Sequence, residues 1–310
     1  MNLTTDDADG KIRLDQYLAA HLPELSRSRI QNLIKSGDVL VNGSPAKPKN
    51  PVSRGDSITV RIPEPEPAEA QPQDIPLDIV YEDENLLLLN KRPGLVVHAD
   101  ETEKVNTLIN HIQAYLYQKR EWNPKWENAF TPALCNRIDR NTGGIVIAAK
   151  DAETLRVINE KIRDRELDKR YLCITAGRPK KSEGRVECFL LKDEQKKQVS
   201  VYHKPIPGGK TAITDYRVLE TRGELSLVEI GLETGRTHQI RATMADLGCP
   251  LLGDGKYGRG DVNRRYGETR QALYAYKLTF DLPTDAGHLN YLRGQSFTVE
   301  NVPFRDKYFG

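Results

Sequence analysis

Short apolar runs rich in strand-forming residues occupy most of the chain after residue 78, and few helical patterns separate them. The predicted strands are residues 79–81, 86–90, 144–148, 170–175, 211–219, 225–232, 273–280 and 295–299. Strands that outnumber helices and do not alternate strictly with them are typical of an α+β domain rather than of a parallel α/β fold. We therefore predict a mainly antiparallel or mixed β-sheet with flanking helices for this part of the chain.

Two helices are predicted within this domain. Asp151 is a suitable N-cap for the first helix, which carries apolar residues at helical spacing. The second helix is predicted over residues 235–247, with Gly248 at its C-terminal stop. On that helix His238 and Arg241 are three residues apart, so they share one face.

The N-terminal segment, residues 11–62, has a different character. Helical spacing predicts two short helices before residue 37, and two strands follow, the first entering an Asn-Gly turn. The segment carries nine Lys and Arg residues against four Asp and Glu residues. Arg27, Arg29 and Lys35 lie off the apolar face of the second helix. Such a basic face can bind nucleic acid, although charge alone is equally compatible with an ordinary solvated surface.

A run rich in proline and glutamate separates this segment from the rest of the chain. From Pro63 to Asn85 there are eight acidic residues and no basic one. Such a run is extended and semi-rigid, and its charge repels phosphate. We therefore predict a small α/β domain over residues 11–62, a linker over 63–76 and a larger domain over 77–310.

The cysteine spacing and the hydropathy of the chain argue against several classes of protein. The four cysteines are widely spaced and form no Cys-x-x-Cys pair, which argues against both a zinc site and a disulfide framework. The chain has no apolar run of about 18 residues and no signal-like start. We therefore expect a cytoplasmic protein with no membrane partner. The net charge of +2 says nothing by itself about nucleic acid.

Three polar clusters interrupt the apolar runs, and the first covers residues 136–144. Within it, Asp139 lies between Arg137 and Arg140. A neighbouring cation favours the charged form of a carboxylate, so we expect Asp139 to be ionised even if it is partly buried. Two glycines at the end of the cluster allow its backbone to approach a ligand closely. A purely structural Asp–Arg clamp explains the same spacing equally well.

The other two clusters are weak signals when each is taken alone. Residues 235–241 place polar donors near a predicted helix start, where phosphate or carboxylate groups bind, but a capped amphipathic helix has the same pattern. In the third cluster Tyr171 follows Lys169 and Arg170. A tyrosine beside cations can stack on a nucleobase, although a tyrosine at a strand start is more often a core residue.

In their order and spacing, the three clusters together resemble the motifs of the RluA-type pseudouridine synthases. Residues 136–144 resemble His-Arg-Leu-Asp-x-x-Thr-Ser-Gly, residues 169–171 resemble Lys-x-Tyr, and the run Gly-Arg-Thr-His-Gln-Ile-Arg at 235–241 is nearly unchanged. The resemblance covers roughly residues 75–300. Residues 11–62 resemble the small RNA-binding module named after ribosomal protein S-four. This combination is similar to family members that act on large-subunit (23S-type) ribosomal RNA.

The resemblance implies an isomerase that cleaves the bond between uracil and ribose, turns the base and rejoins it through C5. It implies no cofactor and no metal. Asp139 corresponds to the catalytic residue of the family, which acts as a nucleophile or as a base toward the sugar. Arg241 resembles its salt-bridge partner, and Tyr171 resembles the residue that stacks on the flipped base and can accept the C5 proton. Arg137 resembles the residue that fills the gap left by the base.

RNA is therefore the expected partner of a monomeric enzyme. Flipping a uridine out of a helix costs a few kcal/mol, and phosphate contacts help to offset that cost. Besides Arg137, the residues expected to contact RNA are Arg140, Arg236 and His238 near the catalytic cluster and Arg27, Arg29 and Lys35 in the basic module.

Two positions depart from the family pattern. Asn136 stands in place of the usual His, and Gly143 in place of the usual Ser. We interpret both as changes in loop support or RNA contact. They motivate one alternative, a non-catalytic RNA-binding or ribosome-assembly factor on the same fold. A separate alternative is the same reaction on transfer RNA.

Overall fold

The computed structural model of the protein describes residues 2–5, 9–22, 25, 27–62, 76–126, 129–193 and 195–310. These residues form two compact units, Met1–Glu69 and Ala70–Gly310. The predicted linker over residues 63–76 lies outside the described residues apart from Pro76. No helix in the described part is both long enough and apolar enough to span a membrane.

The N-terminal unit packs two helices against a small sheet. Its helices are α1 (Leu14–His21) and α2 (Arg27–Ser36), and its four-stranded sheet has the order β1-β6-β3-β4 beside a separate β2–β5 pair. The strands are β1 (Asn2–Thr4), β2 (Asp9–Arg13), β3 (Val39–Val41), β4 (Ser44–Pro45), β5 (Pro51–Ser53) and β6 (Ser57–Val60). Leu18, Ile34 and Ile58 are among the residues of its buried core. The two helices predicted for this segment are therefore confirmed.

The turn between β3 and β4 is the one that the Asn-Gly pair predicts. Asn42 and Gly43 have φ angles of 52° and 79°. A two-residue hairpin turn with positive φ at both positions matches the twist of the flanking strands. The Asn42 side chain also donates to the Asp56 carboxylate at 2.8 Å, which ties this turn to the start of β6.

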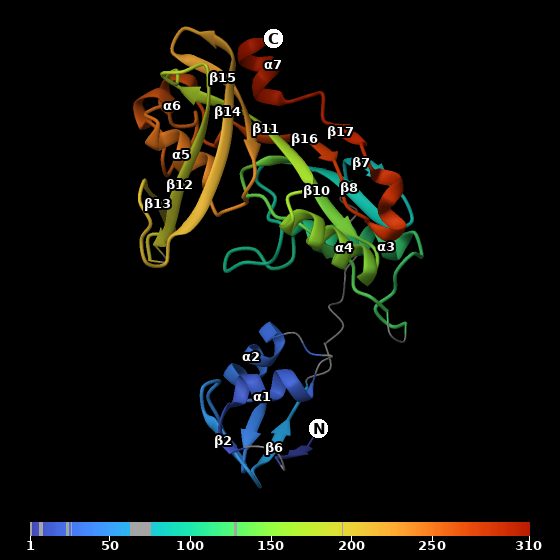
Figure 1. Ribbon diagram of the computed structural model, residues 1–310. Helices are drawn as coiled ribbons and strands as arrows, with labels where there is room; N and C mark the ends of the chain where they lie inside the picture. Colours follow the sequence, from blue (N-terminus) through green and yellow to red (C-terminus); the bar gives the residue numbers. More distant parts are fainter. Residues whose placement is uncertain are drawn as a thin grey trace. The chain divides into compact units, whose positions relative to one another are not determined.

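The C-terminal unit is built on one mixed sheet of eleven strands (Figure 1). Its order is β13-β12-β14-β15-β11-β16-β10-β8-β7, with β17 beside β16 and β9 beside β10. The strands are β7 (Ile79–Glu82), β8 (Leu86–Lys91), β9 (Ala133–Leu134), β10 (Gly143–Ala149), β11 (Leu167–Ala176), β12 (Glu183–Asp193), β13 (Gln198–Tyr202), β14 (Lys210–Arg222), β15 (Leu225–Leu232), β16 (Leu273–Phe280) and β17 (Ser296–Thr298). The described pairs are antiparallel except for β10–β16, which is parallel. The predicted fold class is confirmed.

Helices cover both faces of this sheet. They are α3 (Leu108–Gln118), α4 (Ala152–Arg163), α5 (Gln239–Asp246), α6 (Gly260–Tyr266), the 3₁₀-helix η1 (Gly287–Leu292) and α7 (Pro303–Phe309). Asp151 caps α4 as predicted, because its carboxylate accepts the Thr154 N–H at 2.8 Å. Strands β12 and β13 were not predicted, because exposed polar side chains surround the one short apolar run of β12 (residues 188–191) and alternate with apolar ones along β13.

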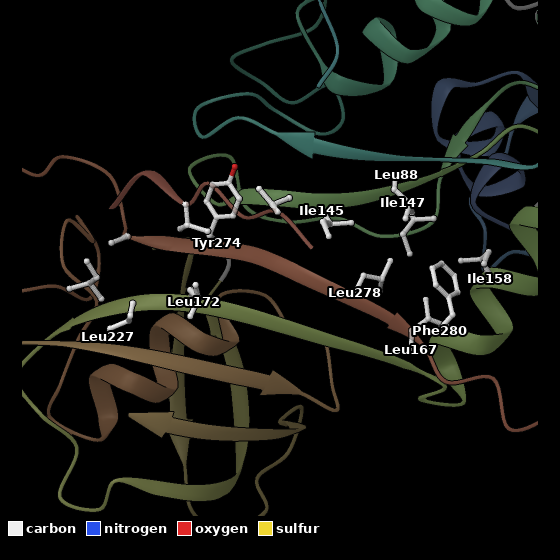
Figure 2. Close-up of a cluster of buried hydrophobic side chains, with 14 of the residues drawn as sticks. Leu88, Ile145, Ile147, Ile158, Leu167, Leu172, Leu227, Tyr274, Leu278 and Phe280 are labelled. Carbon is white, nitrogen blue, oxygen red and sulfur yellow. The ribbon is translucent and has the colours of Figure 1, made fainter. Parts of the chain in front are cut away.

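The alternation of side chains along the central strands decides which helix covers which face. Leu88 of β8 packs with Ile158 of α4 in the cluster that Figure 2 shows, whereas its neighbour Leu87 packs in the cluster that contains Ile112 of α3. A third cluster joins α5 to the face of β11 opposite to α4. Ile138 packs against both the α3 cluster and the α5 cluster, so the loop that carries Asp139 lies on their shared face.

Candidate active site

Asp139 lies in the loop between β9 and β10, and hydrogen bonds support that loop from within and from β10. The Thr142 N–H donates to the Asp139 carbonyl at 3.0 Å. The Ile147 N–H donates to the Asn136 side-chain oxygen at 2.8 Å. Asn136, which stands where the family has a His, therefore ties the loop to β10. The Asp139 side chain remains 29% exposed, which leaves its carboxylate open to a ligand.

The two glycines after Asp139 serve a different purpose from the one predicted. An ideal Cβ on Gly144, whose φ is 108°, would lie 2.2 Å from the Ala275 carbonyl oxygen. A Cβ on Gly143 would lie 2.3 Å from the Tyr274 ring. The prediction that these glycines let the backbone approach a ligand is thus corrected. They let β10 approach the parallel strand β16, which places the Asp139 loop over the junction of the two strands.

We expect Gly143→Ser, which restores the residue usual in the family, to destabilise this protein by about 1–3 kcal/mol. The added side chain would meet the Tyr274 ring, whose hydroxyl is held by a hydrogen bond to Asn90 at 2.6 Å. Thermal and urea unfolding of the full chain measure the effect. Gly255→Ser is the matched control, because a Cβ there meets no atom within 4 Å. Equal stability of the two variants would contradict the tight fit of Gly143.

Lys91 supports the same loop from β8, although it was not among the predicted site residues. Its side chain is 1% exposed, and its ammonium donates to the carbonyl oxygens of Arg92, Leu95 and Arg140 at 3.1, 2.9 and 2.9 Å. Burial lowers the pKa of Lys91 to about 7, while the charge of Asp139 acts in the opposite direction. Lys91 therefore fixes the backbone immediately after Asp139.

The cation that pairs with Asp139 comes from far along the chain. Arg241 Nη1 donates to Asp139 Oδ2 at 2.9 Å. The sequence neighbour Arg140 instead donates to Thr102 Oγ1 at 2.7 Å and lies 3.5 Å from Asp100 Oδ2. The structure thus brings together the predicted pair of Asp139 and Arg241 and turns Arg140 toward another loop.

Arg241 is held from its other side by Asp254, a residue for which the sequence predicted no role. Arg241 Nε and Nη2 donate to the two oxygens of Asp254 at 2.7 and 2.9 Å. Burial would raise the pKa of Asp254, but the hydrogen bonds and charge of Arg241 outweigh it and lower that pKa. Against its own burial, these two carboxylates raise the pKa of Arg241, which keeps the guanidinium charged. Asp254 lies within residues 75–300, the span that resembles the family, and that resemblance was the only signal for it.

The helix that carries Arg241 is shorter than predicted. It begins at Gln239, and His238 is its N-cap with a left-handed φ of 52°. The side-chain oxygen of Gln239 accepts the Arg236 N–H at 3.0 Å and the Thr234 hydroxyl at 2.9 Å. These bonds hold residues 235–238 in a turn, so the predicted helix over 235–247 is wrong at its start. Ile240 is 4% exposed and faces the core as expected.

His238 faces Asp139, and a tyrosine fixes its orientation. The Tyr257 hydroxyl accepts the Val199 N–H at 2.7 Å and lies 2.9 Å from His238 Nδ1. Because the Tyr257 oxygen accepts from Val199, its proton can be donated to His238 Nδ1, which leaves the imidazole proton on Nε2. That atom lies 3.9 Å from Asp139 Oδ2. Burial lowers the pKa of His238, although the charge of Asp139 acts in the opposite direction.

Tyr171 lies on β11 at an irregularity in its pairing with β16. The register shifts between Arg170 and Tyr171, and such a bulge redirects the side chain that follows it. Tyr171 is 7% exposed and belongs to the α5 cluster, yet it also lines the cavity at Asp139. Burial, together with the charge of Asp139, raises the pKa of Tyr171 to about 12, so the phenol is protonated at neutral pH.

These side chains surround a cavity of about 180 Å³. Sites for drug-sized ligands occupy roughly 300–1,000 Å³, so this one suits a single ring-sized group. It is lined by Arg137, Ile138, Asp139, Thr142, Tyr171, Leu232, Gly235, Arg236, Thr237, His238, Gln239, Ile240, Arg241 and Leu273.

The predicted RNA contacts divide between several places. Arg137 and Arg236 are exposed at the cavity, and Arg236 Nε donates to the Thr211 carbonyl at 3.0 Å. Arg27, Arg29 and Lys35 are exposed on α2 of the N-terminal unit. They lie off the buried face of α2, as predicted.

Both parts of the chain match known families. Residues 85–246 match the family model described as RNA pseudouridylate synthase, and residues 12–58 match the S4 domain. The ribosomal large subunit pseudouridine synthase D of Zymomonas mobilis is 37% identical, with 90% of this chain and 89% of that protein covered. The uncharacterized RNA pseudouridine synthase YlyB of Bacillus subtilis is 32% identical, with 94% of this chain and 93% of that protein covered.

A solved structure also resembles this chain. It is the human RNA pseudouridylate synthase domain containing 4, which aligns with a TM-score of 0.57 over 73% of this chain and 89% of its own. The sequence identity is 23%, so the likeness is one of fold.

Proposed function

Because the chain belongs to the RNA pseudouridylate synthase family, we propose that it converts uridines of large-subunit ribosomal RNA into pseudouridine with Asp139 as its catalytic carboxylate. The family makes the protein an RNA pseudouridine synthase, which is an isomerase. The observation that supports the catalytic assignment is the position of Asp139. It lies on the wall of a ring-sized cavity, held by Arg241 and faced by Tyr171.

The reaction breaks the bond from ribose C1′ to uracil N1, rotates the base and forms the bond from C1′ to C5. The proton on C5 is lost and N1 gains one, so no atom is gained or lost overall. One ionised oxygen of Asp139 has one of two roles. It acts as a nucleophile toward C1′ or toward the uracil ring, or it removes a proton from the sugar. Arg241 keeps that oxygen charged and oriented within a partly buried site.

Tyr171 is proposed to stack on the flipped base. Its ring lines the cavity, and its raised pKa of about 12 keeps the phenol neutral. A neutral phenol is a poor acceptor for the C5 proton, so stacking is the better supported of the two predicted roles. Arg137 is proposed to enter the space that the base leaves in the RNA, and its exposed position at the cavity supports this role.

The choice of large-subunit ribosomal RNA rests on relatives and on the N-terminal unit. Proteins of Zymomonas mobilis, Xylella fastidiosa and Neisseria meningitidis that are similar over most of this chain are named ribosomal large subunit pseudouridine synthase D. The S4 domain adds a basic helix, α2, to contact phosphates of a folded RNA.

The experiment that tests this function maps pseudouridine across all cellular RNA from a deletion strain and from the same strain carrying the wild-type gene. We expect modified sites in large-subunit ribosomal RNA to disappear and to return on complementation. If pseudouridine is lost only from transfer RNA, the substrate is transfer RNA and not ribosomal RNA. If no pseudouridine is lost at any site, the assignment is contradicted.

We expect deletion of residues 1–62 to weaken binding to structured ribosomal RNA by at least about tenfold, because phosphate contacts supply much of such affinity. Binding to a short stem-loop that carries the target uridine should change little. The measurement is an RNA-binding titration at one fixed salt concentration with both RNAs. Equal weakening for the two RNAs would count against this role of the N-terminal unit.

A further inference from the structure

Asp254 is a fully buried charged group near the cavity, although it does not line it. The side chain is 0% exposed. One of its oxygens, Oδ1, accepts the backbone N–H groups of Lys256 and Tyr257 at 2.8 and 3.1 Å, and both oxygens accept from Arg241. Two parallel N–H···O bonds from a guanidinium to a carboxylate are strong and fix the plane of the guanidinium.

The chain around Asp254 is shaped to hold this carboxylate still. Gly253 before it has a φ of 76°, and a Cβ on Gly258 would lie 2.2 Å from the Asp254 carbonyl oxygen. Asn263 of α6 bonds both sides of the residue: it accepts the Gly253 N–H at 2.7 Å and donates to the Asp254 carbonyl at 3.2 Å. The turn therefore fixes the position of Asp254 independently of its contact with Arg241.

The arrangement limits what Arg241 can offer to Asp139. Of its three nitrogens, Nε and Nη2 are committed to Asp254, so Nη1 alone reaches Asp139 Oδ2. His238 Nε2 also faces Oδ2, at 3.9 Å. Among the described residues, nothing donates a hydrogen bond to Asp139 Oδ1. Oδ2 of Asp139 is thus hydrogen-bonded, whereas Oδ1 accepts no hydrogen bond from the described residues. Asp139 lines the cavity.

We infer that Asp254 is a positioning residue for the reaction. It orients Arg241 so that this arginine binds only one oxygen of Asp139, and Oδ1 is therefore the oxygen that reacts. The inference rests on the proposed catalytic role of Asp139. Without Asp254 the guanidinium is free to rotate and to bind both oxygens of Asp139 in the usual bidentate manner. That geometry would occupy the reacting oxygen and misplace the carboxylate.

The first test is Asp254→Asn, measured by steady-state kinetics on the RNA substrate in the full-length protein. We expect kcat to fall about 10²-fold, because a displacement of about 1 Å in a reacting group has an effect of this size. KM should stay within about twofold, since Asp254 does not line the cavity. Asp261→Asn is the matched control, because Asp261 is 57% exposed and pairs with the exposed Arg259; it should retain wild-type rates. A wild-type kcat for Asp254→Asn would overturn the inference.

A second variant keeps the inference testable even if Asp254→Asn folds poorly. Arg241→Lys retains a positive charge next to Asp139 but lacks the planar fork that Asp254 holds. We expect its kcat to fall as far as that of Asp254→Asn. If Arg241→Lys keeps a rate within about threefold of the wild type, anchoring by Asp254 is unnecessary and the inference fails.

The double variant separates positioning from a general structural role. If Asp254 acts by orienting the guanidinium of Arg241, adding Asp254→Asn to Arg241→Lys should lower kcat little further. If the fold losses in kcat of the two single variants multiply in the double variant, Asp254 acts independently of Arg241 and the inference is overturned. The proposed function would fail in a different way, since it requires that the wild type form pseudouridine and that Asp139→Asn not do so.

Discussion

Asp139→Asn is expected to lower the rate of pseudouridine formation by on the order of 10⁴-fold or more, the size of loss seen when a nucleophile or essential base is removed. The substitution preserves shape, and the amide oxygen can still accept the N–H of Arg241 that now reaches Oδ2 at 2.9 Å. What is lost is the negative charge, which both a nucleophile and a base require. Single-turnover assays on substrate RNA measure the rate.

The folded state of this variant must be checked in parallel. The side chain of Asp139 is 29% exposed, so we expect only a small change in melting temperature. Asp164→Asn removes a carboxylate that is 42% exposed and pairs with Arg163 outside the cavity, and it should be fully active. Pseudouridine at every wild-type site in a strain that carries only Asp139→Asn would refute the catalytic assignment. Rescue of a growth defect without pseudouridine would instead indicate that RNA binding is the function that the cell needs.

The parts of the fold that sequence predicted well are those where one local pattern decides the outcome. Leu86 to Leu89 form a continuous apolar run and are buried on both faces of the sheet. The Asn42-Gly43 turn and the Asp151 cap depend on residues only a few positions apart. In each case the relevant interactions form within one turn or one strand, so the sequence contains all the information.

The errors occurred where distant contacts override the local pattern. Residues 235–238 have a helix-compatible sequence, but the Gln239 side chain holds them in a turn. Arg140 is adjacent to Asp139 yet pairs with Asp100. Asp254 could not be identified as the partner of Arg241, because that contact depends on the packing of α5 against a turn thirteen residues later. Spacing alone cannot show which of several acids and bases meet in the folded chain.

The same buried contact makes Arg241→Ala the substitution with the largest combined effect on stability and activity. The Asp254 carboxylate, which is 0% exposed, would lose both bonds from Arg241, the only side chain that donates to it in the described part of the chain. Removal of one partner from a buried ion pair costs about 3–5 kcal/mol in the free energy of unfolding. We also expect the rate to fall by about 10²–10³-fold, because Asp139 loses the donor that orients it. Urea unfolding and single-turnover kinetics measure the two effects.

The stability loss in Arg241→Ala should depend on pH in a direction that the pKa of Asp254 determines. In the wild type that pKa lies below the ordinary value of 3.8, so the carboxylate contributes stability above pH 3.8, which is lost as the pH falls through its lowered value. In the variant, burial raises the pKa with only two backbone N–H groups opposing it, so protonation relieves the unpaired charge. The difference in unfolding free energy between the two proteins should therefore be largest near neutral pH and should narrow toward pH 3.8. Arg259→Ala, which removes an exposed arginine, should show neither the loss nor the pH dependence. A difference that stays constant with pH would mean that the charge of Asp254 does not depend on Arg241.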